Sequence, residues 1–299
     1  MSRPEIVAII AHDAGGAEIL ASYIAQNNLE CRFVLDGPAK NIFSRRFGAI
    51  ELFTLEKAIA ISDWCLCGTG WQTDLEWSAI EHGGKAGKKV IAFLDHWVNY
   101  KERFIRNERH LCPDEIWVGD RYAEKVANEN FPDIIIKCVT NPYFIDIKKQ
   151  IAQLKNKNNI VKGTHNNILY VSENISAHAL LRYGDERYFG YTEKDALNYF
   201  LENINLLGYA ESEIKIRPHP SENPNKFEWV KQFDNISIKI GGYKTLIEEI
   251  TESDVIVGCE SMAMVVGLLA DKRVISSIPL NGKKCSLPQK EIEHLQALL

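Results

Sequence analysis

The chain of 299 residues is about twice the usual length of one compact domain, so two domains are expected. Its composition, with 45% hydrophobic and 25% charged residues, supports sizeable cores and excludes a disordered chain. The 35 Lys and Arg residues against 40 Asp and Glu residues give a net charge of -5, which offers no long-range attraction to nucleic acid or anionic membranes and argues against a general nucleic-acid binder.

The first half alternates short β-branched runs with helical patterns, which predicts a parallel, doubly wound sheet. The expected strands are Ile6–Ala11, Cys31–Leu35, Trp64–Cys67, Val90–Leu94, Glu115–Val118 and Ile134–Val139. Between them, the stretches Ala17–Gln26 and Gln72–Glu81 carry apolar residues three and four apart, as helices that cover a sheet do. Residues 1–147 are therefore expected to form a Rossmann-like domain.

Residues 148–164 have a different composition, rich in Lys, Asn and Gln, with lysines but no acid between Lys148 and Gly163. This change predicts a solvated helix end and a linker between domains. A basic strip that touches phosphate is the alternative.

The second half, residues 165–299, repeats the alternation and is expected to form a second Rossmann-like domain. Its expected strands are Asn167–Ser172, Glu213–Arg217, Ile236–Ile240, Asp254–Gly258 and Arg273–Ser277, and its expected helices are Glu193–Leu207, Thr245–Thr251 and Ser261–Ala270. Two α/β domains of similar size predict an architecture in which they face each other across a ligand-binding cleft.

The seven cysteines are an odd number and lie mostly in apolar stretches, which argues against a disulfide framework. The apolar run Ile6–Ala11 is too short for the hydrophobic region of a signal peptide, and no later run approaches the length of a membrane span. We therefore expect a cytoplasmic protein without a transmembrane segment, in which any membrane association comes from a partner.

Polar and glycine-rich loops follow three strands of the first half. They are His12–Gly16, Gly68–Trp71 with Thr69 at its centre, and Asp95–Trp97. Because ligands bind at the carboxyl ends of strands in an open parallel sheet, these loops predict a site. The alternative is ordinary turn chemistry, which favours the same residue types.

Gly15 and Gly16 allow the backbone to approach a ligand closely and expose the free N–H groups at the start of the next helix, a favourable place for an anion. They do not form the G-x-G-x-x-G pattern of dinucleotide-binding proteins, although Asp36 stands where a ribose-binding acid would. A bound NAD-type cofactor is therefore not expected.

His12, Asp13, Asp95 and His96 form two His/Asp pairs at these strand ends. Our preferred interpretation is a general base with an orienting carboxylate. The second interpretation is structural, with His96 capping a helix and Asp13 satisfying loop amides, and the third is a metal site. The sequence contains no D-x-D motif, which weakens the case for a metal-bridged diphosphate.

The second half contains two further candidates for phosphate binding. Arg217 and His219 lie in the segment Arg217–Pro220, where flanking prolines fix the histidine backbone outside a regular helix. The segment Gly258–Met262 ends a strand and begins a helix, so that Glu260, Ser261 and Met262 lie at a helix N-terminus. Ser172, at the end of the first strand of this half, completes the predicted phosphate-binding set. The alternatives are an ordinary turn role for His219 between its prolines and a simple N-cap by Ser261.

At these residues the chain resembles GT-B-fold glycosyltransferases. The resemblance is to the groups with a His-Pro motif, namely bacterial sialyltransferases, capsule Kdo transferases and the CDP-glycerol glycerophosphotransferases of teichoic acid synthesis. It rests on Arg217–Pro220, on the strand and helix in Ser253–Ser276, and on the segment Thr140–Phe144, which is similar to a Gly-Asn-Pro segment before the interdomain linker. Where those families carry a Ser-Ser or Ser-Thr pair, this chain has Glu260 and Ser261.

The resemblance implies a metal-independent transferase that moves a sugar or polyol-phosphate group from a CMP-, CDP- or UDP-linked donor to a glycan or lipid-linked acceptor in bacterial surface polysaccharide synthesis. It implies that His219 stabilises the leaving phosphate, that Ser261 binds it, and that Asp13 or His12 serves as the acceptor base. No further cofactor is expected. The alternatives are a nucleotide-sugar hydrolase, a non-hydrolysing 2-epimerase and a catalytically silent nucleotide-sugar binding protein.

Overall fold

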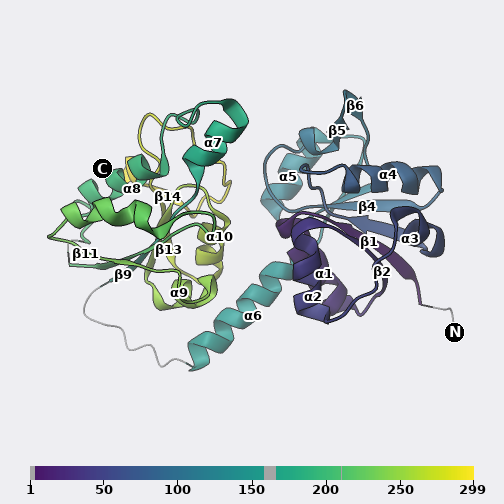
Figure 1. The fold of residues 1–299 in the computed structure, drawn as a ribbon, viewed down its shortest axis with the longest axis horizontal. Coiled ribbons are helices and arrows are strands. Elements are labelled where there is room, and N and C mark those ends of the chain that lie inside the picture. Colours follow the sequence, from purple (N-terminus) through teal and green to yellow (C-terminus); the bar gives the residue numbers. More distant parts are fainter. Residues whose placement is uncertain (1–3, 158–165, 210) are drawn as a thin grey trace. The chain divides into compact units, whose positions relative to one another are not determined.

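The computed structural model describes residues 4–157, 166–209 and 211–299. The chain divides into two compact units, Met1–Asp146 and Ile147–Leu299. Each unit has its own six-stranded sheet and its own hydrophobic core (Figure 1).

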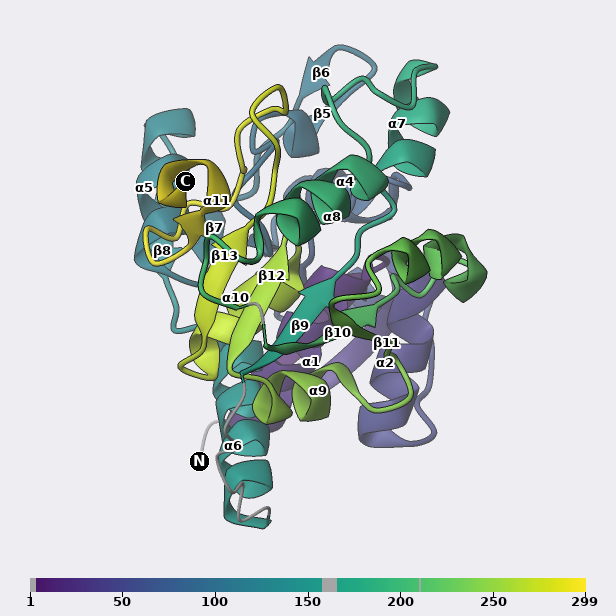
Figure 2. The same cartoon turned by 90° about the vertical axis from the view of Figure 1, so that its left-hand side faces the viewer.

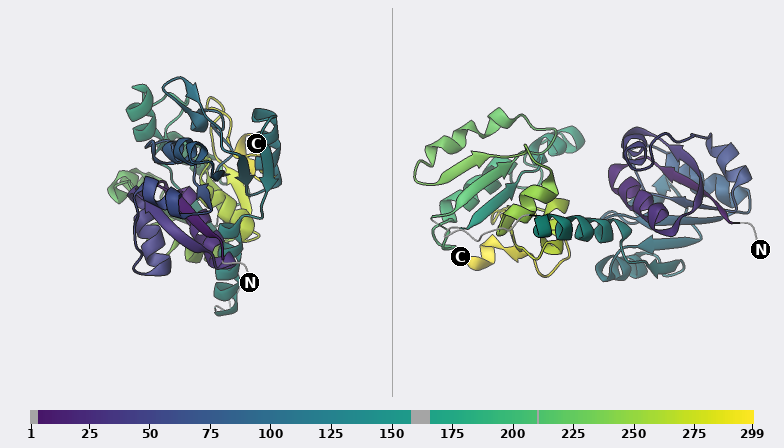
Figure 3. Two further views of the ribbon diagram at one scale, coloured as in Figure 1. Left: turned by 90° about the vertical axis from the view of Figure 1, so that its right-hand side faces the viewer. Right: turned by 90° about the horizontal axis from the view of Figure 1, so that it is seen from below.

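The sheet of the N-terminal unit is parallel throughout, with the strand order β2-β1-β3-β4-β7-β8. Figure 3 draws the same ribbon from two further sides. Its strands are β1 (Ile6–Ala11), β2 (Glu30–Leu35), β3 (Trp64–Cys67), β4 (Lys89–Leu94), β7 (Glu115–Val118) and β8 (Ile135–Cys138). All six predicted strands are confirmed. The order reverses at β1, which pairs with β2 on one side and with β3 on the other.

Helices α1 (Ala14–Asn27) and α4 (Leu75–Lys85) confirm the two predicted helical stretches of this unit. The remaining helices are α2 (Gly37–Phe47), α3 (Leu55–Ile61) and α5 (Arg121–Asn130). Local caps begin two of them, since the Thr54 hydroxyl accepts from the Lys57 amide and Asp120 accepts from the Ala123 amide. The core lies between the buried strands and the apolar faces of α1 and α2.

The segment after β4 contains the short 3₁₀ helix η1 (Glu102–Phe104) and an antiparallel pair, β5 (Ile105–Arg106) and β6 (Arg109–His110). Asn107 and Glu108 turn this hairpin with φ angles of 48° and 62°, in the left-handed region that tight two-residue hairpin turns require. The hairpin returns the chain to the loop after β3, because Arg106 Nη2 donates to the Gly70 carbonyl at 3.0 Å.

The C-terminal unit has the strand order β11-β10-β9-β12-β13-β14, again parallel throughout (Figure 2). Its strands are β9 (Asn167–Val171), β10 (Glu213–Arg217), β11 (Ser237–Ile240), β12 (Val255–Gly258), β13 (Arg273–Ser276) and β14 (Glu293–His294). The five predicted strands are confirmed, and β14 is an addition. The order reverses at β9, which lies between β10 and β12.

The helices of this unit are α7 (Ile175–Tyr183), α8 (Glu193–Asn203), the 3₁₀ helix η2 (Pro224–Gln232), α9 (Leu246–Glu252), α10 (Met262–Leu269) and α11 (Leu295–Leu298). Capping boxes begin α8 at Thr192 and α9 at Thr245, each with an acid three residues later. The core packs α8 and η2 against the sheet. The predicted helices Glu193–Leu207, Thr245–Thr251 and Ser261–Ala270 correspond to α8, α9 and α10.

Helix α6 (Pro142–Lys157) contains the boundary between the two units. The Asn141 side chain caps it by accepting from the amides of Tyr143 and Phe144 at 3.0 and 3.2 Å. The predicted linker 148–164 is therefore helical as far as Lys157, and its remainder lies outside the described residues. Among the described residues, no helix is long and apolar enough to cross a membrane.

Candidate functional site

The loops after β1, β3 and β4 lie at one edge of the N-terminal sheet because these three strands are parallel neighbours. The reversal of strand order at β1 places the first loop at the position where open α/β sheets bind ligands. The sequence predicts this shared edge, and the strand pairing confirms it.

His12 and Asp13 form a direct pair, with 2.7 Å between His12 Nδ1 and Asp13 Oδ1. The imidazole is held from its other side by Gly37, at the start of α2. A side chain at Gly37 would place its Cβ 2.5 Å from His12 Nε2, and Gly37 also has a left-handed φ of 49°. The pair is thus fixed in orientation, as a base with an orienting partner requires.

Glu76 on α4 is a third acid at this edge that the sequence interpretation missed. Its side chain is buried, and its Oε1 accepts from the backbone amide of His12 at 2.8 Å, whereas Oε2 has no hydrogen-bond partner among the described residues. Burial raises the pKa of Glu76, and the Asp13 carboxylate raises it further. A Cβ at Gly70 would meet Asp13 Oδ2 at 2.8 Å and Glu76 Oε1 at 2.9 Å, so the two carboxyl groups converge on that glycine.

Asp95 is paired with Arg103, another residue the sequence interpretation missed. Arg103 Nη1 donates to Asp95 Oδ1 at 2.7 Å and to Thr69 Oγ1 at 2.9 Å, which ties the loops after β3 and β4 together. A Cβ at Gly15 would lie 2.2 Å from Asp95 Oδ2, and one at Gly16 would lie 3.4 Å from the Gly68 backbone. Asp95 and the Gly68 backbone therefore fill the space beside these two glycines, where the sequence predicts the approach of a ligand.

His96 follows Asp95 and packs edge-on against the indole of Trp97, with 5.3 Å between ring centroids. Trp97 in turn donates from Nε1 to Asp120 at 2.9 Å. Within residues 4–157, 166–209 and 211–299, no group of three or more His, Cys, Asp or Glu residues is arranged to hold a metal ion.

In the C-terminal unit, the strand order reverses at β9 and brings three loops to one edge. Ser172 to Asn174 follow β9, His219 follows β10, and Cys259 to Ser261 follow β12. The predicted phosphate-binding residues of this half all lie in or next to these loops.

His219 is exposed, and its ring is oriented through Nδ1. The backbone amide of Ser221 donates to Nδ1 at 3.2 Å, and Ser221 Oγ lies 2.7 Å from the same atom. Because Ser221 Oγ already accepts from Asn174 Nδ2 at 2.9 Å, its proton is free to point at the ring. The hydrogen-bond network therefore assigns the proton of the neutral imidazole to Nε2.

A buried ionic network holds the His219 loop from below. The His219 amide donates to Glu222 Oε2 at 2.8 Å, and Lys226 Nζ lies 2.6 Å from both Glu222 and Glu193. Glu193 accepts in turn from the amide and the hydroxyl of Ser176 at the start of α7. These contacts fix the backbone that carries the histidine.

Arg217 is turned toward Glu249 rather than left free. Its Nη1 donates to the buried Glu249 Oε2 at 2.5 Å and to the Lys244 carbonyl at 2.9 Å. Glu249 Oε1 also accepts from the Gly242 amide at 2.8 Å. Arg217 therefore links the end of β10 to the loop before α9.

Ser261 is the N-cap of α10, and its hydroxyl accepts from the Ala263 amide at 3.1 Å, which is the simple N-cap that the sequence also allows. Met262 is the first residue of the helix. Glu260 is engaged by the C-terminal segment, since its carboxylate lies 2.6 Å from Lys283 Nζ and accepts from the Ser286 amide at 3.0 Å.

Glu173, absent from the predicted site, reaches from β9 to the start of α10. Its Oε1 accepts from the amides of Cys259 at 3.1 Å and Glu260 at 2.8 Å. The neighbouring Ser172 is 6% exposed, and its hydroxyl has no hydrogen-bond partner among the described residues. The sequence does carry a signal for Glu173, because this acid follows the apolar strand Asn167–Ser172 directly.

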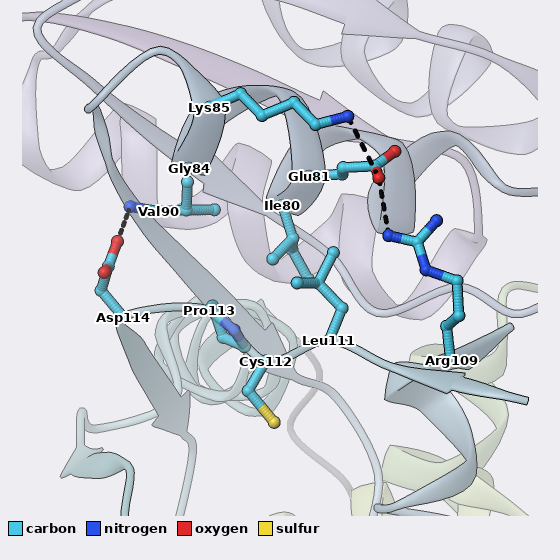
Figure 4. A pocket seen from close by; sticks show the side chains of 10 residues that line it. All are labelled: Ile80, Glu81, Gly84, Lys85, Val90, Arg109, Leu111, Cys112, Pro113 and Asp114. Atoms are coloured by element: carbon cyan, nitrogen blue, oxygen red, sulfur yellow. Dashed lines mark hydrogen bonds and ion pairs between the residues drawn. The ribbon is translucent and has the colours of Figure 1, made fainter.

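The cavity drawn in Figure 4 lies at the opposite, amino edge of the N-terminal sheet and has a volume of about 360 Å³. Glu81 stands in it between Lys85 and Arg109, at 3.2 and 2.8 Å, and Asp114 accepts from the Val90 amide. Glu81, Lys85 and Arg109 are thus paired with one another, and none of the predicted site residues lines the cavity.

No protein-family model and no curated protein sequence matches the chain. Solved structures are similar to it. A UDP-GlcNAc 2-epimerase from Methanocaldococcus jannaschii has a TM-score of 0.59 at 13% identity, covering 91% of this chain and 83% of that one. A UDP-GlcNAc 2-epimerase from Neisseria meningitidis, bound to UDP-GlcNAc, has a TM-score of 0.60 at 11% identity, covering 91% and 82%.

An α/β-galactoside α-2,3-sialyltransferase from the luminous marine bacterium Photobacterium phosphoreum is also similar, with a TM-score of 0.49 at 9% identity and each chain covered in full. At these identities the likeness is one of fold. The chain has the two Rossmann-like α/β units of GT-B-like proteins, which confirms the fold class expected from the sequence and, at the level of fold, the resemblance. The expected cleft stays a prediction.

Proposed function

We propose that the chain transfers a sugar or polyol-phosphate group from a CMP-, CDP- or UDP-linked donor to an acceptor hydroxyl. The observation that carries this proposal is the state of His219, whose Nδ1 accepts hydrogen bonds and whose exposed ring keeps its proton on Nε2. A fixed N–H donor at a strand-order reversal suits the phosphate of a leaving nucleotide. The fold supports the proposal, because the similar solved structures are named for nucleotide-sugar enzymes.

The phosphate of the donor is proposed to lie at the carboxyl edge of the C-terminal sheet. There His219 Nε2 would donate to it, and the Ser172 hydroxyl, the Ser261 side chain and the Met262 amide are the further candidates for contact. Arg217 would act by positioning, since its guanidinium is already bound to Glu249. Donors aimed at developing charge contribute strongly to transfer reactions.

The acceptor base is proposed to be Asp13, oriented by His12. In the transfer, the acceptor oxygen forms a bond to the transferred group, and its proton passes to the Asp13 carboxylate. The bond from that group to the donor phosphate breaks, and the electron pair leaves with the nucleotide. His219 stabilises the charge that develops on the leaving phosphate.

A hydrolase or a non-hydrolysing 2-epimerase is the second candidate function. The observation in its favour is the convergence of Asp13 and Glu76 at Gly70, because two neighbouring carboxyl groups suit proton removal and return at one carbon. Products formed from the nucleotide sugar and water alone, or an epimerised nucleotide sugar, would identify this reaction.

The biological setting is part of the proposal. We infer that the acceptor is a glycan or a lipid-linked glycan of bacterial surface polysaccharide synthesis, that no metal ion or other cofactor takes part, and that contact with a membrane is made through a partner. A catalytically silent nucleotide-sugar binding protein would bind the same nucleotides without turnover.

The first experiment measures thermal stabilisation of the purified protein by CMP, CDP, UMP, UDP, GDP and NAD, since a ligand of the folded state raises its stability. We expect a shift with CMP, CDP or UDP that is lost in His219→Ala and kept in the control His294→Gln, which changes an exposed histidine on β14. A response to none of these nucleotides would contradict the proposal. Product analysis with and without an acceptor alcohol then separates transfer from hydrolysis and epimerisation.

A further inference from the structure

The carboxylate of Glu173 lies against the loop that leads into α10. It accepts from the amides of Cys259 and Glu260, directly before the N-cap Ser261 of α10. A negatively charged group of the protein therefore occupies the two backbone donors directly before Ser261 and Met262, which the proposed function assigns to a phosphate. The Ser172 hydroxyl beside it is buried and unpartnered among the described residues, a second polar group at this edge that a ligand would satisfy.

The groups that face Glu173 are mostly neutral or negative. They are Tyr170 on β9, Tyr191 in the turn before α8, Cys259 and Glu260 directly before α10, and Cys285 in the C-terminal segment. The one cation nearby, among the residues named here, is Lys283, which is paired with Glu260. Burial raises the pKa of Glu173 to about 7, and the Glu260 charge adds to the rise, while the amides of Cys259 and Glu260 oppose it. Both protonation states are therefore populated at neutral pH.

We propose that Glu173 is a built-in occupant of the donor-phosphate site, and that a nucleotide displaces its negative charge by proton uptake. This inference rests on the proposed function. The step adds one solvent proton to the Glu173 carboxylate and forms or breaks no other covalent bond. The neutral carboxyl group releases the amides of Cys259 and Glu260 to the phosphate, and it no longer repels a second anion.

The need for a proton on Glu173 predicts how strongly nucleotide affinity depends on pH. With a pKa of about 7, roughly nine-tenths of Glu173 is protonated at pH 6 and roughly one-tenth at pH 8. Because apparent affinity scales with the competent fraction, nucleotide affinity should fall about tenfold from pH 6 to pH 8. The same argument gives an uptake of about half a proton per nucleotide bound at pH 7, where half the population is already protonated.

The test is calorimetric titration of the full chain with CDP, and with UDP in parallel, at pH 6, 7 and 8 in two buffers of different ionisation heat. Glu173→Gln keeps the shape of the side chain without its charge. Relative to the wild type, we expect this variant to bind about twice as tightly at pH 7 and about tenfold more tightly at pH 8, with the extra proton uptake abolished. Taking the ratio of the two proteins at each pH cancels ionisation of the nucleotide itself.

Glu213→Gln is the control, a half-buried carboxylate of the same unit at the amino end of β10, and it should behave as the wild type. Binding with equal affinity and equal proton uptake in wild type and Glu173→Gln would overturn the inference and leave the proposed function standing. Weaker binding by Glu173→Gln at every pH would also overturn it. Binding of neither nucleotide to any variant would overturn both. Should Glu173→Gln fail to fold, the buffer dependence of the wild type alone decides, since zero uptake at pH 8 contradicts the inference.

Discussion

In each unit a glutamate accepts a hydrogen bond from the backbone of a loop at the reversal point of the sheet. Glu76 accepts from the amide of His12, and Glu173 accepts from the amides of Cys259 and Glu260. Burial is the main cause of the raised pKa of both residues. Both carboxyl groups therefore hold a loop in place, and ionisation of either group lowers the stability of the folded state.

The pH dependence of stability is the first prediction. A raised pKa means that the contribution of Glu173 is fully present below its unfolded value near 4.5 and is lost as the pH rises through about 7. A shift of this size corresponds to about 3 kcal/mol. Glu173→Gln should therefore gain melting temperature relative to the wild type between pH 5 and pH 8. A difference that stays constant across this range would contradict the prediction.

Glu76 provides the second prediction. Glu76→Ala removes the acceptor of the buried His12 amide and should lower the free energy of unfolding by about 1–3 kcal/mol. Glu76→Gln keeps an acceptor at the same position and should lose less. Denaturant unfolding of both variants measures the difference, and equal losses would show that the carboxyl charge matters more than the hydrogen bond.

At the scale of secondary-structure elements, close contacts give two glycines opposite roles. Gly15 lies at the start of α1, and a Cβ there would lie 2.2 Å from Asp95 Oδ2. Gly84 lies near the end of α4, and a Cβ there would meet no atom within 4 Å. In open space, alanine favours a helix over glycine.

The third prediction follows from this contrast. Gly15→Ala should push Asp95 away from its Arg103 partner and lower stability, and under the proposed function it should also lower activity. Gly84→Ala should raise stability by about 0.5–1 kcal/mol. Thermal unfolding of the two variants measures both effects, and destabilisation by Gly84→Ala would contradict the helix argument.

The strands could be predicted from the sequence because each is a short apolar run, and runs such as Ile6–Ala11 are buried on both faces. Helices such as α3 and α5 were missed because their buried faces consist of only two residues each, which gives little periodicity. The hairpin of β5 and β6 was missed because two-residue strands carry no pattern.

The site could be predicted only in part. His12 and Asp13 are neighbours in the chain, and their hydrogen bond needs no long-range information. Arg103 and Glu173 reach partners on other loops, and only the fold brings these together. The partners of a charged side chain that lies between strand ends are set by strand order rather than by local pattern.

At the scale of the whole molecule, the two units have separate cores and separate sheets. Each is of the size that folds independently, and the boundary between them lies within α6. Independent folding is therefore expected of each unit.

The fourth prediction is that fragments 1–146 and 147–299, produced separately, each unfold cooperatively. Circular dichroism and calorimetry of the two fragments measure this, with the full chain as the control. An unfolded fragment would show that the cores depend on each other. Nucleotide binding by fragment 147–299 alone would further support the assignment of the donor site to that unit.

The loop after β9 has a consequence for how this chain can change over evolution. Glu173 and Asn174 are adjacent, yet one bonds the start of α10 and the other bonds Ser221 in the His219 loop. Inserting or deleting one residue here would misalign both contacts at once. Among the described residues, Asn107 and Glu108 in the turn between β5 and β6 do not bond two other loops in this way. Length variation among descendants should therefore collect in that hairpin and be absent from the turn between β9 and α7.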